Sequence, residues 1–134
     1  MKVFLDTNVL ASALAARGLC AELFESVLAE HELIVNPLLL IELKRILTTK
    51  LRISADVARD YITLLTTEGI TVATPSVIPE GIPDPDDAPL IAAALASGAE
   101  CFVTGDKALL ALNTVGDLAI LSPRQFWERT RISR

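Results

Sequence analysis

Carboxylates recur in this chain at the points where short apolar runs end. Asp6 directly follows the run 2–5, and Asp106 follows the run 101–105 in the same way. Three more acids between Asp84 and Asp87 lead into another apolar stretch. Carboxylate oxygens gathered in a crevice bind hard divalent cations such as Mg²⁺ and Mn²⁺. One or two such ions can activate a water and stabilise a leaving oxygen, so the pattern favours metal-dependent hydrolysis of phosphodiester bonds.

Apolar runs of strand length alternate with segments of helical spacing. We expect strands at residues 2–5, 33–35, 70–72, 101–103 and 119–121. We expect helices at residues 7–16, 20–30, 37–49, 54–67, 88–97, 107–112 and 123–131. This alternation predicts one α/β domain over residues 1–134, a three-layer α/β/α sandwich around a central, mainly parallel sheet of about five strands. Ligands of such sheets bind at the carboxyl ends of the strands, so the acids are expected to converge there.

Composition limits the classes of protein to consider. The chain has 134 residues, of which 51% are hydrophobic and 4% aromatic, which favours one domain with an aliphatic core. We see no apolar run of roughly 18 residues and no signal peptide, so we expect a cytoplasmic protein with no membrane association. Cys20 and Cys101 lie in apolar segments and are expected to be reduced. The net charge of −5 argues against a protein that coats nucleic acid but not against a nucleic-acid enzyme, because bound metal would offset part of it.

Three of the acidic positions also have an ordinary structural explanation. Asp6 and Asp106 each stand where an aspartate would cap the N-terminus of a helix. Acids in a first helical turn stabilise the helix dipole, which accounts for one or two of the aspartates between residues 84 and 87. Three acids in four residues repel one another, by roughly 3 kcal/mol for a pair about 5 Å apart at an effective dielectric of about 20. That repulsion favours either a bound cation or an open, solvated loop.

Among these three aspartates, Asp87 is the preferred ligand. It stands closest to the apolar helix that follows, which would hold it in place. Asp84 and Asp86 lie further into a proline-rich loop and remain alternatives, with Asp84 assigned a supporting role.

Glu42 is an acid inside an otherwise apolar helical segment. Leu38 and Ile46 lie four residues before and after it and therefore share its helix face. A buried carboxylate costs several kcal/mol unless it is paired or bound to a metal. Glu42 is accordingly a metal ligand, the partner of Arg45 three residues later on the same helix, or partly exposed to solvent.

Two polar residues can support the acids. Asn8 can hydrogen-bond and orient Asp6 or cap the first helix, and Thr104 can hold a water or orient a carboxylate. The single histidine, His31, lies between two glutamates at a turn and is expected to be solvated. Neither cysteine has a neighbour at zinc-ligand spacing, and no glycine-rich phosphate-binding motif occurs.

Taken in order, these motifs resemble those of the PIN-domain family. The resemblance lies in Val3-Phe4-Leu5-Asp6-Thr7-Asn8-Val9-Leu10, in Ile41-Glu42-Leu43, in the segment from Asp84 to Ala94, and in Phe102-Val103-Thr104-Gly105-Asp106-Lys107-Ala108-Leu109-Leu110. Each motif alone is weak, but the ordered set is fairly specific. The resemblance implies a Mg²⁺- or Mn²⁺-dependent endoribonuclease that cleaves single-stranded RNA. It implies metal ligation by Asp6, Glu42, Asp87 and Asp106, supported by Asn8 and Thr104.

Many small members of that family are toxins of toxin–antitoxin pairs and form dimers. The resemblance therefore implies an antitoxin protein as a partner, and a homodimer. A non-catalytic PIN-like module that holds RNA or a protein is the alternative, favoured by the acidic charge and the lack of an obvious basic groove. A receiver-like phosphoacceptor domain also gathers acids at strand ends, but it needs a second acid beside the first, and Asp6 has none.

Overall fold

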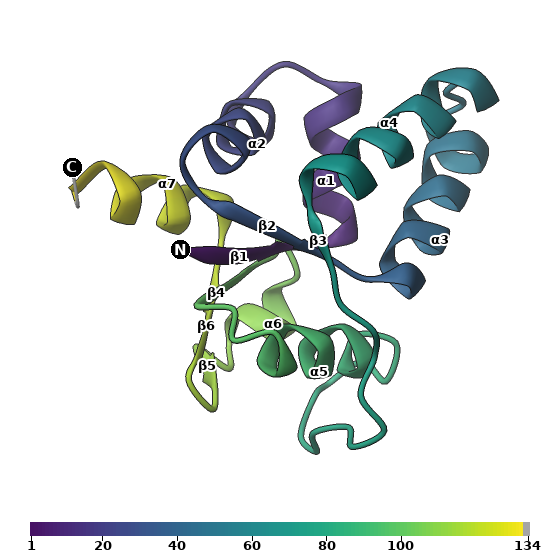
Figure 1. The fold of residues 1–134 in the computed structure, drawn as a ribbon. Coiled ribbons are helices and arrows are strands. Elements are labelled where there is room, and N and C mark those ends of the chain that lie inside the picture. The colour runs from purple at the N-terminus through teal and green to yellow at the C-terminus, as the bar shows by residue number, and fades with distance from the viewer. Residues whose placement is uncertain (133–134) are drawn as a thin grey trace.

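The computed structural model describes residues 1–132. Within them, six strands form one sheet in the order β3-β2-β1-β4-β6-β5 (Figure 1). The strands are β1 (Lys2–Leu5), β2 (Glu32–Val35), β3 (Ile70–Thr71), β4 (Cys101–Val103), β5 (Thr114–Val115) and β6 (Leu118–Leu121). Every neighbouring pair is parallel except β5 and β6, which confirms the predicted mainly parallel sheet.

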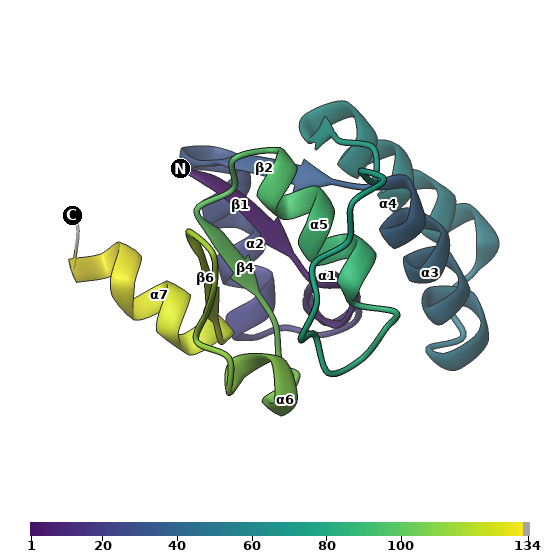
Figure 2. The same cartoon turned by 90° about the horizontal axis from the view of Figure 1, so that it is seen from below.

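Helices cover both faces of this sheet. They are α1 (Thr7–Ala15), α2 (Leu19–Glu30), α3 (Pro37–Arg45), α4 (Ala55–Glu68), α5 (Ala88–Ala96), α6 (Lys107–Leu110) and α7 (Pro123–Ile132). A π-helical turn, η1 (Ile46–Lys50), continues α3. Figures 1 and 2 show α5 on one face of the sheet, with α1 and α2 on the other and α3 and α4 side by side near β2 and β3. The predicted α/β/α layering is therefore confirmed.

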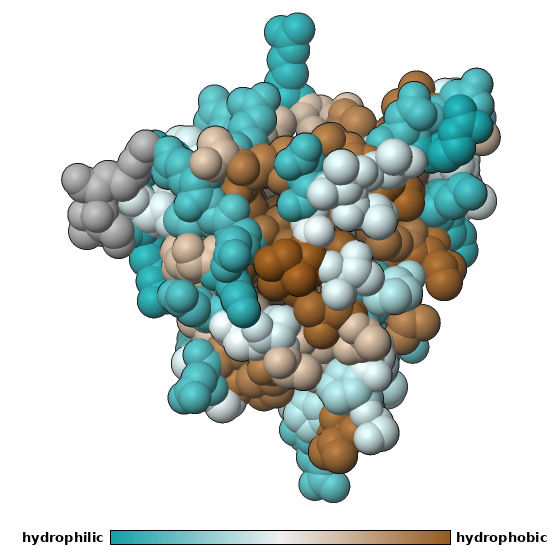
Figure 3. Space-filling view, viewed as in Figure 1, coloured by the Kyte–Doolittle hydropathy of each residue, from teal (hydrophilic) through white to brown (hydrophobic). Residues whose placement is uncertain are grey.

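The strands are buried because they are almost wholly apolar, as expected for parallel strands covered on both faces. Phe4 on β1 and Phe102 on β4 are fully buried partners in register, and their rings stack with centroids 5.0 Å apart. Some apolar surface stays outside the core. Figure 3 shows hydrophobic side chains over the middle of one face. Ile70 on β3 and Val77 in the segment that follows are among the exposed apolar residues.

A fully buried asparagine links α3 to the loop that precedes α5. The Oδ1 atom of Asn36 caps α3 by accepting the backbone N–H of Leu38 at 2.9 Å and that of Leu39 at 3.4 Å. Its Nδ2 atom donates to the carbonyl of Val72 at 2.9 Å and to Oγ1 of Thr74 at 3.0 Å. One side chain therefore fixes both the start of α3 and the beginning of the proline-rich loop.

We expect Asn36→Ala to lower the free energy of unfolding by about 2 kcal/mol, because it removes a helix cap and two buried hydrogen bonds. Urea denaturation followed by circular dichroism would measure the change. Asn36→Asp keeps the capping oxygen but loses the amide donor, so it should fall between wild type and Asn36→Ala. Equal stability of all three proteins would contradict this role.

Two local features differ from the sequence expectation. Strand β5 was not predicted, because it is two residues long and its sequence contains no apolar run. It pairs with β6 through a tight turn in which Gly116 has a φ of +57°. The end of the predicted helix 37–49 is the π-helical η1, where the N–H of Leu51 donates to the carbonyl of Ile46. The ends of the other elements differ from their predicted positions by at most two residues.

Three smaller expectations can be checked. Cys20 and Cys101 are both free thiols, as predicted. His31 is not solvated: it is half-buried, with its ring 5.8 Å from that of Phe126, because α7 packs against α2 and closes over the turn. Within residues 1–132, every helix is too short or too polar to cross a membrane.

Candidate active site

The order of the sheet brings the ends of β1 and β4 together. Leu5 pairs with Val103, and the backbone N–H of Asp6 donates to the carbonyl of Val103 at 2.9 Å. The chain places β2 and β3 on one side of β1, and β4 and β6 on the other. The order of strands along the chain therefore reverses between β1 and β4, and open α/β sheets bind ligands at the carboxyl ends of the strands at such a point. Asp6 and Thr104, the first residues beyond these two strands, both lie at that point.

A single buried hydroxyl joins two of the candidate ligands. Oγ1 of Thr104 donates to Oδ2 of Asp6 at 2.8 Å and accepts the backbone N–H of Asp106 at 3.0 Å. Thr104 is fully buried, so water does not compete for these bonds. Thr104 therefore orients the Asp6 carboxylate and fixes the backbone of Asp106 beside it.

Asp6 is itself buried, with 6% of its surface exposed. Its Oδ1 atom accepts the N–H of Thr7 at 2.8 Å and so caps α1. Burial raises the pKa of the Asp6 carboxyl above its ordinary value; the hydrogen bonds from Thr104 and Thr7 oppose this rise, and the negative charge of Asp106 adds to it. A cation at this carboxylate would offset the cost of burying its charge.

Asp106 serves as a helix cap while keeping one oxygen available. Its Oδ1 atom accepts the N–H of Ala108 at 2.8 Å and that of Leu109 at 3.3 Å at the start of α6. Within the part of the chain that the structure describes, Oδ2 makes no hydrogen bond. The capping interpretation of Asp6 and Asp106 thus holds, and each cap uses only one of the two carboxylate oxygens.

The negative charges of four other acids act on Asp87. Burial, followed by the charges of Asp6, Asp84, Asp106 and Glu42, raises its pKa to about 7. Although Asp87 precedes α5, its side chain makes no capping hydrogen bond to that helix. Helix capping therefore does not explain this acid. Three of the acids that act on Asp87 come from other parts of the chain, Asp6, Asp106 and Glu42, and a bound cation would offset their repulsion.

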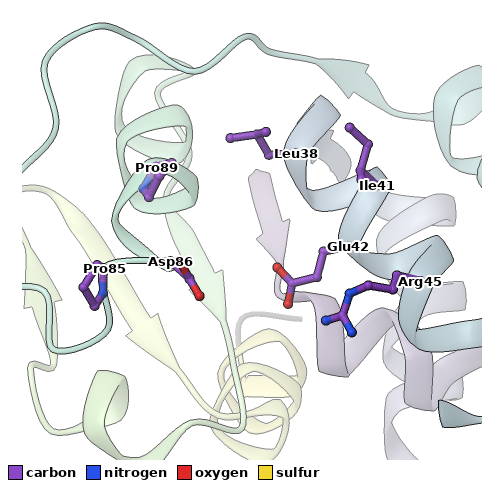
Figure 4. Close-up of a pocket in the computed structure, with 7 residues that line it drawn as sticks. All are labelled: Leu38, Ile41, Glu42, Arg45, Pro85, Asp86 and Pro89. Atoms are coloured by element: carbon purple, nitrogen blue, oxygen red, sulfur yellow. The ribbon is translucent and has the colours of Figure 1, made fainter. Parts of the chain in front are cut away.

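The other two loop acids behave differently from each other. Oδ1 of Asp84 accepts the N–H of Asp86 at 2.9 Å, and the carbonyl of Asp84 accepts the N–H of Asp87 at 3.0 Å. Asp84 therefore shapes the turn that carries the next two acids. Asp86 lies on the wall of a pocket and faces Glu42 across it (Figure 4).

Glu42 reaches this pocket from α3. Its carboxylate points toward the loop that carries Asp86, and the guanidinium of Arg45 lies beside it (Figure 4). Within residues 1–132, the nitrogens of Arg45 are not within 4.0 Å of a carboxylate oxygen, so the alternative of a Glu42–Arg45 salt bridge is wrong. The other alternative, partial exposure, is confirmed, because Glu42 is half-buried. The sequence places Arg45 near Glu42 through its i+3 spacing, but it does not show that both side chains line one pocket.

Within residues 1–132, Asn8 makes no hydrogen bond to the Asp6 side chain. It is exposed on α1 and lines a separate pocket of about 340 Å³ with Ser12, Ile46 and Lys50 among its neighbours. Thr104 and Thr7 hold Asp6 instead. Any supporting role of Asn8 must therefore act on something in that second pocket rather than on the orientation of Asp6.

The donor set fits a hard divalent cation. Every candidate ligand is a carboxylate, and neither histidine nor cysteine is among them, which suits Mg²⁺ or Mn²⁺ better than Zn²⁺. Burial and neighbouring negative charges raise the pKa values of Asp6 and Asp87, and a bound cation would oppose both effects. Within residues 1–132, no three acidic, histidine or cysteine side chains are already gathered closely enough to form a metal-binding group.

In the metal-free protein, Asp87 should make stability depend on pH. Its pKa is raised on folding, so the free energy of unfolding should fall as pH rises from about 4 to about 7. The shift corresponds to about 4 kcal/mol, which solvent screening of a partly exposed carboxyl reduces to about 1–2 kcal/mol. Asp87→Asn should therefore be more stable than wild type at about pH 8 and no more stable at about pH 4.

Urea denaturation in EDTA across this pH range would test the prediction. The matched control is Asp60→Asn, at an aspartate of α4 whose side chain is 79% exposed. Its pH profile should run parallel to that of wild type. A parallel profile for Asp87→Asn as well would contradict the shift.

Comparison with known proteins adds a family and a fold. A family model described as a PIN domain matches residues 2–108. No curated protein matches the chain. Eleven chains of solved structures match, among them one from the crystal structure of VapBC2 from Rickettsia felis bound to a DNA fragment from their promoter. The match has a TM-score of 0.64 at 12% identity and covers 91% of this chain and 98% of that chain. At that identity the similarity shows the fold alone.

Proposed function

This chain belongs to the PIN-domain family, and on that premise we propose that it is a metal-dependent endoribonuclease that cleaves single-stranded RNA. PIN domains are generally nucleases that use divalent metal ions. The observation that carries the proposal is the buried Thr104 hydroxyl, which ties Asp6 to Asp106 at the strand ends. Capping α1 requires only the hydrogen bond from Thr7 to Asp6. The additional buried hydrogen bonds through Thr104, which link Asp6 to Asp106, are not needed for a helix cap.

Asp6, Glu42, Asp87 and Asp106 would hold the cation, with Mg²⁺ or Mn²⁺ as the candidates. When bound, such an ion activates water for attack on phosphorus and stabilises the leaving oxygen. Thr104 keeps the Asp6 carboxylate in one orientation, and the burial of Asp6 keeps bulk water away from it. Without a cation, the carboxyl of Asp87 holds a proton up to a pH of about 7, so cation binding should release this proton.

We also propose that the protein acts as the toxin of a toxin–antitoxin pair. The solved neighbour belongs to a VapBC2 complex, and its fold covers nearly all of this chain. Apolar side chains are exposed on α4, at Val57 and Leu64. Exposed apolar groups of this kind suit a protein partner, which would be an antitoxin or a second copy of the chain.

Cleavage of a mixed-sequence, end-labelled, single-stranded RNA would test the nuclease proposal. We expect the purified protein to cut this RNA with Mn²⁺ and to leave it intact with EDTA. Asp106→Asn should not cut under either condition. Calorimetry would show in parallel whether Mn²⁺ binds. Metal binding without cleavage of any RNA would instead favour a non-catalytic PIN-like module, and the absence of metal binding would contradict the assigned ligands.

A further inference from the structure

A groove between α3 and the proline-rich loop combines charged and apolar walls next to the candidate ligands. Its volume is about 380 Å³, and it is lined by Leu38, Ile41, Glu42, Arg45, Pro85, Asp86 and Pro89. This volume lies at the lower end of the range for small-molecule sites. Figure 4 shows the two carboxylates facing each other across the groove, with the guanidinium at one end and apolar side chains at the other.

Arg45 is the positively charged residue that lines this groove. Within the part of the chain that the structure describes, the N–H groups of its guanidinium are not used in a salt bridge. In residues 1–132, two exposed arginines elsewhere on helices pair with acids at similar spacing: Arg59 lies 3.3 Å from Asp56, and Arg124 lies 4.0 Å from Glu128. Arg45 has Glu42 at the same spacing but lies beyond 4.0 Å from its oxygens. Its planar set of N–H groups therefore remains open to a ligand.

The backbone that carries Arg45 is firmly held. Arg45 is the last residue of α3, and the π-helical η1 begins immediately after it. The hydroxyl groups of Thr48 and Thr49 donate to the carbonyl of Arg45, and the following residue, Ile46, is buried in the core. π-Helical turns are often found at functional sites. The base of the side chain is thus fixed while the guanidinium stays exposed at the groove.

The apolar walls of the groove are unusually exposed. Leu38 is 49% exposed and Ile41 is 69% exposed, although both lie on the same helix as the candidate ligand Glu42. On the opposite side, Pro85 and Pro89 present rigid apolar rings. Single-stranded RNA has unstacked bases, which bind to apolar and aromatic surfaces and to arginine.

We propose that this groove binds one nucleotide of the RNA next to the cleaved bond, with Arg45 contacting its phosphate and the apolar walls contacting its base. The inference rests on the proposed function and adds a substrate-positioning residue to it. A guanidinium binds phosphate through two parallel hydrogen bonds. The neighbouring carboxylates repel phosphate, and the guanidinium would add its positive charge to that of the bound cation in attracting the RNA backbone.

The first test is the steady-state cleavage of single-stranded RNA with Mn²⁺ by Arg45→Ala. We expect KM to rise about tenfold and kcat to change less than about threefold, as for a contact made equally in the ground and transition states. Arg45→Lys should recover only part of the loss, because lysine cannot form the two parallel bonds. The control is Lys44→Ala, which removes a neighbouring positive charge that does not line the groove.

The second test measures binding without cleavage. Fluorescence anisotropy of a labelled ten-nucleotide RNA would be followed with Asp6→Asn protein, with and without Arg45→Ala. We expect the added substitution to weaken binding about tenfold and to reduce the slope of log K against log salt concentration by about 1. If Arg45→Ala left both KM and RNA affinity unchanged while the wild-type protein cleaves RNA, the proposed nucleotide-binding groove would be overturned and the nuclease proposal would stand. A wild-type protein that neither binds nor cleaves RNA would overturn both.

Discussion

Asp6→Asn should lower kcat/KM for metal-dependent RNA cleavage by about 1,000-fold or more, equivalent to about 4 kcal/mol of transition-state stabilisation. The substitution removes the negative charge of a carboxylate at the strand-end crevice, which a divalent cation needs in its ligand set. The amide keeps the size of the side chain. The result should be a folded protein with almost no activity.

The fold should survive because the local hydrogen bonds can be kept. The amide oxygen can still accept the N–H of Thr7, which caps α1. The amide nitrogen can donate to Oγ1 of Thr104, and a hydroxyl oxygen has two lone pairs, so it can also keep the N–H of Asp106. Burial raises the pKa of Asp6, so replacing it with a neutral side chain removes an unfavourable charge. Stability in EDTA should therefore equal or exceed that of wild type.

Cleavage kinetics and urea denaturation on the same protein would separate the two possible roles. The control is Asp60→Asn, whose exposed side chain on α4 lies away from the site. Activity within about tenfold of wild type would contradict a ligand role for Asp6. A large loss of stability would show instead that folding depends on the charge of this carboxylate.

The positions of the acids along the chain could be predicted, but their connection could not. An apolar run ending at Asp6 is sufficient to place this residue beyond a buried strand. That β1 lies directly beside β4, nearly 100 residues away, follows from strand order, which the order of elements in the sequence does not determine. Only this adjacency brings the hydroxyl of Thr104 to the carboxylate of Asp6.

Side chains on helices show the same limit. The spacing around Glu42 predicted correctly that it shares a face with apolar residues, yet it also suggested an ion pair with Arg45 that the structure does not contain. Helical periodicity predicts which residues share a face of the helix. The direction of their charged groups depends on the loop across the groove, which periodicity does not describe. The π-helical η1 was equally hidden, because it involves bonds from Thr48 and Thr49 to backbone carbonyls that an apolar pattern does not record.

Thr104→Val should damage both stability and activity, and this distinguishes it from Asp6→Asn. Valine matches threonine in shape, so packing at this fully buried position should be preserved. The loss would be confined to two buried hydrogen bonds, one to Oδ2 of Asp6 and one from the N–H of Asp106. Because both groups would remain buried or partly buried without a partner, we expect the free energy of unfolding to fall by about 3–5 kcal/mol.

Activity should fall about 100-fold in the same variant, because a carboxylate that is free to rotate holds a cation less well than one fixed by a neighbouring group. The hydrogen bond from Thr104 also lowers the pKa of Asp6, so its loss should raise that pKa further and shift the dependence of cleavage on pH upward. Urea denaturation in EDTA and cleavage rates across pH would measure these effects. Thr104→Ser retains the hydroxyl and should restore most of the activity; if serine and valine behaved alike, the methyl group rather than the hydrogen bonds would be the important part of Thr104.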